Sequence, residues 1–239
     1  MRFTSAIVFA AAALLCGCIY GDDNSSANTT HFQQRAKPGQ AVALDVDGSI
    51  GVELLLTASP DGFVRLDATP LHGLSGLRLT QAADAQWLRL RLDPPSGQGQ
   101  PMHWPFGRGR EAKITLSVPP DATVSVNAVN GPVHADGVHG PLAIHLVNGP
   151  IEVAGAGNVL SLHLVNGPIS VAIEDQSRTP NINIAGTNGS IEVIVPKGFR
   201  AMVDAHTVLG PLDERLSNTQ GPGSMSVRLV AGPVTIEER

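Results

Sequence analysis

The sequence predicts an all-β chain with a single domain, a parallel β-solenoid (a β-helix, with the right-handed form favoured) of about 18–22 residues per coil. Two observations support this prediction. The triplet Asn-Gly-Pro recurs at intervals of 18 residues, and degenerate copies continue at intervals of 22, 21 and 22. A run of alternating apolar and polar residues flanks the copies, which is the pattern of half-buried strands. The copies begin at Asn130, Asn148, Asn166, Asn188, Leu209 and Ala231.

The N-terminal residues predict export and a lipid anchor. A short basic start precedes an almost wholly apolar run over residues 4–15, which has the length of a signal-peptide core and is too short to span a bilayer. The run ends in Leu-Cys-Gly-Cys, which resembles a bacterial lipobox with Cys18 as the lipid acceptor. We therefore expect residues 1–17 to be a signal peptide. The alternative is an ordinary cleaved signal peptide or a short anchor.

Residues 18–40 are expected to form the lipid anchor and a flexible tether, because they are polar, lack periodicity and close with Pro38-Gly39. Residue 19 is Ile rather than Asp. In lipoproteins of double-membraned bacteria this feature favours the outer membrane, where the domain would face the periplasm or the cell surface. Both cysteines lie at or before Cys18, so the mature domain is expected to lack disulfides.

The domain is expected to span residues 41–239, with less regular first coils and a cap over 41–117. An irregular loop at 94–111 interrupts this part and combines aromatic side chains with clustered arginines. Loops on a rigid scaffold commonly carry binding sites. The alternative is an insertion whose aromatic residues cover a solenoid end. The strand-like runs are Val42–Val46, Val52–Thr57, Phe63–Ala68, Leu74–Leu79 and Trp87–Leu92, and the candidate binding residues of the loop are Trp104, Phe106, Arg108 and Arg110.

Residues 118–239 carry the regular coils, and proline shows that their triplets are corners rather than hairpin turns. A two-residue hairpin around Asn148-Gly149 would need the N–H of residue 150 to bond the carbonyl of Val147. Proline has no N–H, whereas a corner between two sides of a coil does not need that bond. Glycine supplies the unusual backbone dihedral of the corner. The corner residues are Asn130, Gly131, Pro132, Asn148, Gly149, Pro150, Asn166, Gly167, Pro168, Asn188 and Gly189.

Alternation places apolar side chains inside the coil and stacks equivalent residues of adjacent coils about 4.8 Å apart. The corner asparagines would then form a ladder of buried amides that bond one another along the stack. The alternative is that each asparagine is an exposed turn residue.

The run V-P-x-x-x-x-V-x-V-x-x-x-N-G-P-V at 118–133 and the repeated V-N-G-P-I-x-V resemble the bacterial putative-adhesin domain family. The resemblance covers residues 41–239. It implies a β-solenoid domain of the cell envelope with an adhesin-like or structural role, and it carries over no catalytic residues. Proline after the glycine departs from the family, which usually has an acidic residue or serine there.

The charge balance argues against a nucleic-acid partner. Removal of residues 1–17 takes away one basic residue, Arg2, and leaves 15 Lys and Arg against 21 Asp and Glu, a net charge of −6. Phosphate recognition needs a basic face. Aromatic residues make up only 4% of the chain, which weighs against a stacking platform for sugars or bases.

Two pairs of side chains are candidates for chemistry. His145 and His163 share a column one coil apart and are weak candidates for a shared metal, the alternative being an exposed polar column. Glu152 and Glu192 share a column two coils apart, at about 9.5 Å, the upper limit for an inverting glycosidase pair. The alternative is a pair of solvated glutamates.

The function expected from the sequence is a lipid-anchored envelope protein with an adhesin-like or structural binding role. We expect no catalysis and no cofactor. The expected partners are the membrane, through the lipid, and a glycan or an envelope protein. Two alternatives stay open, a carbohydrate-active β-helix that cleaves polysaccharide and an accessory lipoprotein of the envelope-stress response. The sequence names neither the ligand nor the oligomeric state.

Overall fold

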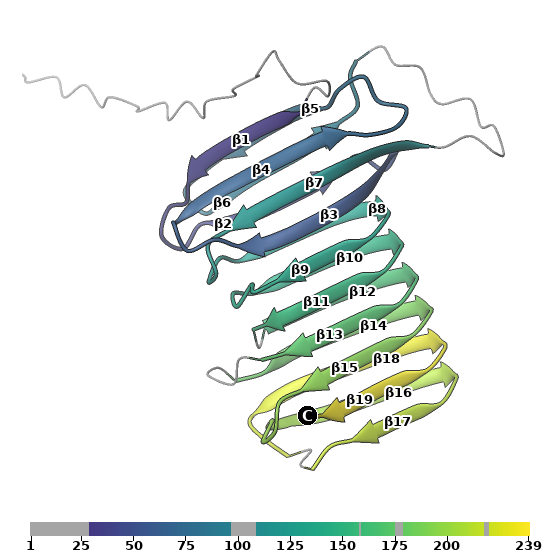
Figure 1. Cartoon of the computed structure of the whole chain (residues 1–239). Coiled ribbons are helices and arrows are strands. Elements are labelled where there is room, and N and C mark those ends of the chain that lie inside the picture. Colours follow the sequence, from purple (N-terminus) through teal and green to yellow (C-terminus); the bar gives the residue numbers. More distant parts are fainter. Residues whose placement is uncertain (1–28, 97–108, 158, 175–178, 218–219) are drawn as a thin grey trace, which may run out of the picture.

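The computed structural model in Figure 1 describes residues 29–96, 109–157, 159–174, 179–217 and 220–239. These residues form one continuous 19-stranded sheet that winds into a stack of coils. The described part contains no helix that is long and apolar enough to cross a membrane. The predicted all-β parallel solenoid is confirmed. The predicted signal peptide and Cys18 lie outside the described residues.

Each coil places one strand on each of two faces, which we call face 1 and face 2. Along the stack, face 1 consists of β5 (Arg78–Ala83), β6 (Trp87–Asp93), β2 (Ala41–Val46), β8 (Val124–Asn130), β10 (Leu142–Asn148), β12 (Val159–Asn166), β14 (Asn181–Asn188), β18 (Gly223–Ala231) and β16 (Ala201–Leu209). Face 2 consists of β1 (Thr30–Arg35), β4 (Phe63–Pro70), β7 (Arg110–Val118), β3 (Ile50–Ala58), β9 (Val133–Asp136), β11 (Ile151–Ala156), β13 (Ile169–Ile173), β15 (Ile191–Val195), β19 (Val234–Glu238) and β17 (Leu212–Arg215).

The central coils stack in parallel register, and each corner bonds to the next coil. Ile144 of β10 lies opposite Val126 of β8 and Leu162 of β12. The amide of Val133 donates to the carbonyl of Pro150 over 3.0 Å. The hydrogen bonds at the corners therefore run between coils, and the missing proline N–H costs nothing there.

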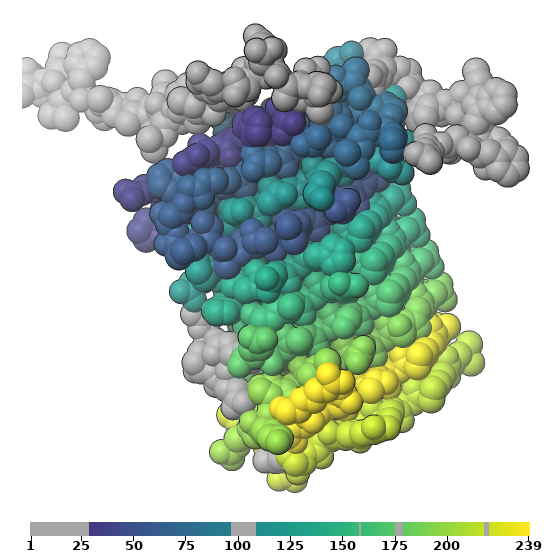
Figure 2. Space-filling view, in the orientation of Figure 1, coloured from purple at the N-terminus to yellow at the C-terminus, as the bar shows by residue number. Residues whose placement is uncertain are grey.

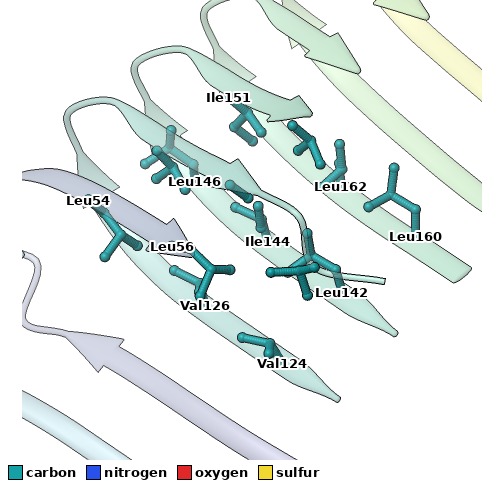
Figure 3. Packing of buried hydrophobic residues seen from close by; sticks show 14 of the residues in the cluster. Leu54, Leu56, Val124, Val126, Leu142, Ile144, Leu146, Ile151, Leu160 and Leu162 are labelled. Atoms are coloured by element: carbon teal, nitrogen blue, oxygen red, sulfur yellow. The ribbon is translucent and has the colours of Figure 1, made fainter. Parts of the chain in front are cut away.

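Alternating side chains of both faces fill the interior of the stack. Ile144 and Ile151 are fully buried and Leu162 packs beside them (Figure 3). Residues that alternate with them, such as His145, are exposed. Each such aliphatic side chain contributes roughly 1.5–3 kcal/mol by leaving water. This burial holds the domain together, because the described residues contain no cysteine that could form a disulfide.

Chain order and stack order differ at the C-terminal end. Strand β18 lies between β14 and β16, and β19 lies between β15 and β17. The last coil in the sequence is thus inserted between the coil of β16 and β17, which precedes it in the chain, and the coil of β14 and β15, as the yellow strands in Figure 1 and the yellow atoms in Figure 2 show. The coils at this end are therefore not stacked in the order of the sequence.

Chain order and stack order also differ at the N-terminal end, where additional strands cap the stack. Strands β6 and β7 pair on the outer side of β2 and β3, although they follow them in the sequence. Three antiparallel strands continue the sheet beyond them, with β5 on β6, β4 on β7 and β1 on β4. Strands β4 and β5, which lie within the predicted segment 41–117, and β1, which precedes it, thus extend the sheet at this end.

Two predictions of local structure in this region are wrong. Residues 30–35, predicted as tether, form strand β1, because the edge of β4 offers free backbone groups and Phe32 becomes buried at 2% exposure. The predicted strand Leu74–Leu79 is shifted to Arg78–Ala83. Its position follows from the hairpin to β6, where the Asp84 carboxylate accepts hydrogen bonds from the amides of Gln86 and Trp87.

Candidate functional site

The corners bring the backbones of adjacent coils into close contact. Gly149 has φ +131°, and a Cβ there would lie 2.3 Å from the carbonyl oxygen of Gly131. At Gly167 the corresponding distance, to the oxygen of Gly149, is 2.2 Å. Glycine is required at these corners both for its dihedral and for the missing side chain. The predicted corner residues are thus structural.

The asparagines beside these glycines form a hydrogen-bonded ladder. The amide nitrogen of Asn148 donates to the side-chain oxygen of Asn130 over 2.9 Å, Asn166 donates to Asn148 over 2.9 Å, and Asn188 donates to Asn166 over 3.0 Å. The ladder is confirmed, but its side chains are not buried: Asn148, Asn166 and Asn188 are exposed and Asn130 is half-buried. Each bond therefore contributes about 0.5 kcal/mol, the low end for a protein hydrogen bond.

An outward column of valines runs along face 1 next to this ladder. Leu146 pairs with Leu164 and Asn148 pairs with Asn166, so the residues between them, Val147 and Val165, are aligned. Their exposed fractions are 37% and 42%. This column could have been predicted from the sequence, because the valine of each V-N-G-P motif is an apolar residue at an outward position.

A second outward column on face 1 is polar. Its members lie two residues before the valines in each coil and are, in stack order, Asn127, His145, His163, Ala185, Arg228 and His206. The amide of Asn127 donates to the carboxylate of Asp45 over 2.6 Å, and Arg228 is 3.2 Å from the carboxylate of Asp204. The column therefore has the Asp45 carboxylate near one end and the Arg228 guanidinium near the other.

The two columns enclose a shallow groove of about 390 Å³. His145 and His163 line one side, and Val147 and Val165 line the other. Beyond His163 the column continues as Ala185, whose short side chain also lines the groove. We call this feature the His–Val groove. Its walls are largely apolar, with imidazole nitrogens available along one side.

The two histidines of the groove are stacked. Their ring centroids are 4.9 Å apart and their planes differ by 3°. Burial lowers the pKa of His145 below its ordinary value, and the charge that His163 can carry lowers it further. A metal shared by both rings would need two nitrogens within about 4.2 Å, twice a typical zinc–nitrogen distance. The described residues contain no cluster of three or more metal-ligating side chains that would complete such a site.

The predicted pair of carboxylates lies on face 2. Glu152 pairs with Ser170 and Ser170 pairs with Glu192, as the sequence predicted. The structure adds His134, whose Nδ1 is 2.9 Å from a carboxylate oxygen of Glu152. A shallow cavity of about 260 Å³ contacts Glu152 and Ser170 but is not lined by Glu192. This cavity therefore does not bring the two carboxylates together, as a glycosidase pair requires.

The loop candidates fall mostly outside the described part of the chain. Trp104, Phe106 and Arg108 belong to the residues that the structure does not describe. Arg110 begins strand β7 and lies opposite Ile50 of β3. Within the described residues, the loop therefore contributes nothing to the His–Val groove.

No protein-family model and no curated protein matches this sequence. Among solved structures, the chain is similar to a putative cell adhesion protein from Clostridium sporogenes, with a TM-score of 0.53, 11% identity, and coverage of 88% of this chain and 100% of that one. A putative adhesin from Bacteroides fragilis is also similar, with a TM-score of 0.38, 14% identity, and coverage of 88% and 97%. At such identities the first likeness shows a common fold, and the second is too weak to support an argument.

Proposed function

We propose that this chain is an adhesin-like binding module of the cell envelope that holds an extended partner in the His–Val groove without catalysis. The observation that carries this proposal is the pairing of two outward columns, one of valines and one of histidines, in register over successive coils. An exposed row of apolar side chains is uncommon on a surface that only meets water. The fold shared with a cell adhesion protein supports the same role.

The geometry favours an extended partner over a compact ligand. Groups in register repeat at the strand spacing of about 4.8 Å, so a polymer that lies across the coils meets a His–Val pair in two adjacent coils, His145 with Val147 and His163 with Val165. Each contact is weak, and affinity accumulates with the number of coils engaged, as in multivalent binding. The partner classes that fit are an envelope glycan strand and an extended segment of an envelope protein.

Binding to isolated envelope fractions tests the groove. Peptidoglycan sacculi and membrane vesicles from cells that produce the protein would be incubated with the Cys18→Ser chain, and the bound fraction would be measured by co-sedimentation. Val147→Asp together with Val165→Asp should lower the bound fraction by about tenfold or more, since two charges would enter the apolar wall. Leu55→Asp is the matched control, because Leu55 is an exposed apolar residue (38%) on face 2. Unchanged binding by the valine variant would show that the groove is not the site.

We also propose that a lipid on Cys18 anchors the domain in the envelope membrane. The lipobox-like sequence before Cys18 supports this proposal. Two acyl chains make membrane attachment stable, whereas one gives reversible binding. Cell fractionation provides the test: the native chain should sediment with membranes, and Cys18→Ser should move to the soluble fraction. Retention of the variant in the membrane fraction would contradict the anchor.

A further inference from the structure

The solenoid ends in an uncovered strand edge at β16. Within the described part of the chain, β16 pairs with β18 on one side and with no strand on the other, whereas the opposite end is extended by β1, β4 and β5. Figure 1 shows β16 and β17 as the last coil of the stack. Two outward side chains of this edge are apolar and open to water, with exposed fractions of 68% for Met202 and 62% for Val208, and the exposed Asp204 and His206 lie between them. A free edge with exposed apolar side chains is a surface suited to strand pairing.

The backbone of β16 presents free hydrogen-bonding groups on this edge. The amide of Ser224 in β18 donates to Pro180, on the side of β14. Because backbone groups alternate along a strand, Met225 and Val227 direct theirs toward β16. The same alternation leaves the N–H and C=O groups of Val203, Ala205 and Thr207 directed away from β18.

We propose that a second copy of the chain docks on this edge, with β16 pairing antiparallel to β16 of the other copy across a two-fold axis at Ala205. Ala205 is the middle residue of the strand, which runs from Ala201 to Leu209. In this register Met202 lies opposite Val208, and Asp204 lies opposite His206. Val203 and Thr207 exchange backbone bonds, as does Ala205 with its own copy, which gives about six hydrogen bonds.

The sequence of the edge is self-complementary in this register and in no neighbouring one. An axis at Asp204 would place the two Asp204 carboxylates against each other, and an axis at His206 would place Asp204 opposite Val208. The axis at Ala205 pairs apolar with apolar and acid with base, and it places both pairs at the sites where side chains approach most closely. This complementarity favours a second copy over an unrelated strand.

The two-fold axis also fits the shape of the whole end. An axis perpendicular to the two faces returns each face to itself, so β17 comes to lie beside β17 of the other copy. β17 is charged, with Asp213 and Arg215 joined in an ion pair, and Glu214 is exposed. Its groups form the polar rim of the interface, and the apolar contact is supplied by β16.

Cysteine cross-linking tests the register directly. In the full chain carrying Cys16→Ser and Cys18→Ser, Met202→Cys and Val208→Cys would be prepared separately. Directly opposed residues have the Cβ separation that a disulfide needs. Mild oxidation should cross-link a mixture of the two variants and leave each one alone largely monomeric. Ala205→Cys alone should cross-link with itself. Failure of the mixture to cross-link, or equal cross-linking of Met202→Cys alone, would overturn the proposed register.

Sedimentation velocity on the Cys18→Ser chain tests the association itself. The chain should show a concentration-dependent dimer, and Met202→Lys with Val208→Lys should weaken it at least about tenfold, because lysine on an edge opposes pairing. The matched control is Val230→Lys, since Val230 is exposed (47%) on the same face in the neighbouring strand β18. A chain that stays monomeric, or a dimer that resists the lysines, would refute the proposal. The His–Val groove variants do not touch this edge, so the two proposals fail independently.

Discussion

Gly149 shows how a single residue fixes the corner of a coil. Its φ is +131°, and a Cβ would lie 2.3 Å from the carbonyl oxygen of Gly131. Two separate constraints therefore act on it, the backbone dihedral and the contact with the adjacent coil. Gly198 carries only the first, because its φ is +79° and nothing lies within 4 Å of its missing Cβ.

We expect Gly149→Ala to lower the free energy of unfolding by about 3 kcal/mol or more, since the coils must separate to admit the methyl group. Gly198→Ala, the control, should cost about 1 kcal/mol, the strain of the dihedral alone. Urea denaturation followed by circular dichroism measures both values. Equal losses in the two variants would show that the contact between coils is unimportant.

His145 predicts a pH dependence of stability. Burial lowers its pKa below the ordinary value of 6.5, and His163 lowers it further. The unfolded chain therefore binds more protons than the folded chain as the pH falls through about 6.5, and the free energy of unfolding decreases. We expect His145→Gln to reduce this loss between pH 7 and pH 5. Replacing His163 with Gln should raise the pKa of His145 in an NMR titration, and a native pKa of 6.5 or above would contradict the argument.

At the scale of elements, the inserted coil of β18 and β19 couples the C-terminal end to the centre. Each strand of this coil bonds to neighbours on both sides, whereas β16 and β17 bond only to β18 and β19 among the described strands. Solenoid stability is close to a sum of contacts between adjacent coils. The coil of β16 and β17 therefore depends on a segment that is synthesised after it.

Deletion of residues 223–239 should consequently also unfold β16 and β17, which remain in the chain. We expect β16 and β17 to lose protection in hydrogen exchange, while β10–β13 stay protected, because their neighbours remain. In a sequentially stacked solenoid the same deletion would leave β16 and β17 on β14 and β15. If residues 201–215 stayed protected, the conclusion that β16 and β17 depend on pairing with β18 and β19 would be contradicted.

The sequence predicted the coils but not their order at the ends. Corners and alternating strands are local signals. The same local pattern predicts each coil, at Asn130, Asn148 and Asn166. Stack order depends on which edge a strand meets, and nothing in a corner encodes that. The same limit explains β1, whose six residues carry no clear alternation and become a strand because β4 offers an edge.

Only part of the candidate site was predicted, because the sequence gives the register of the strands but not the exposure of each side chain. The column of His145 and His163 follows from the register and was found. The groove beside it was missed, because it requires the valine column to stay exposed while other valines are buried. The stacking of the two rings, with centroids 4.9 Å apart, depends on side-chain orientation, which spacing along the chain does not determine.

At the scale of the molecule, the functional features are distributed along one axis. The cap with β1 stands at the end nearest the N-terminus, the His–Val groove lies over the central coils of face 1, and the free edge of β16 is at the far end (Figure 1). A dimer through β16 would place the two β1 strands at opposite extremes. Together with the lipid proposed on Cys18, such a dimer would join two opposing membrane surfaces.

The inserted coils at both ends also limit how this protein can change in length. Chain order matches stack order only from β8 to β15. A duplicated segment can therefore be added in this central region without disturbing any other pairing, whereas a coil appended after β19 would have to leave from between two existing coils. The three intact Asn-Gly-Pro copies, each 18 residues apart, lie in this region. Gene duplication would thus lengthen the molecule from its middle, and both ends would be inherited unchanged.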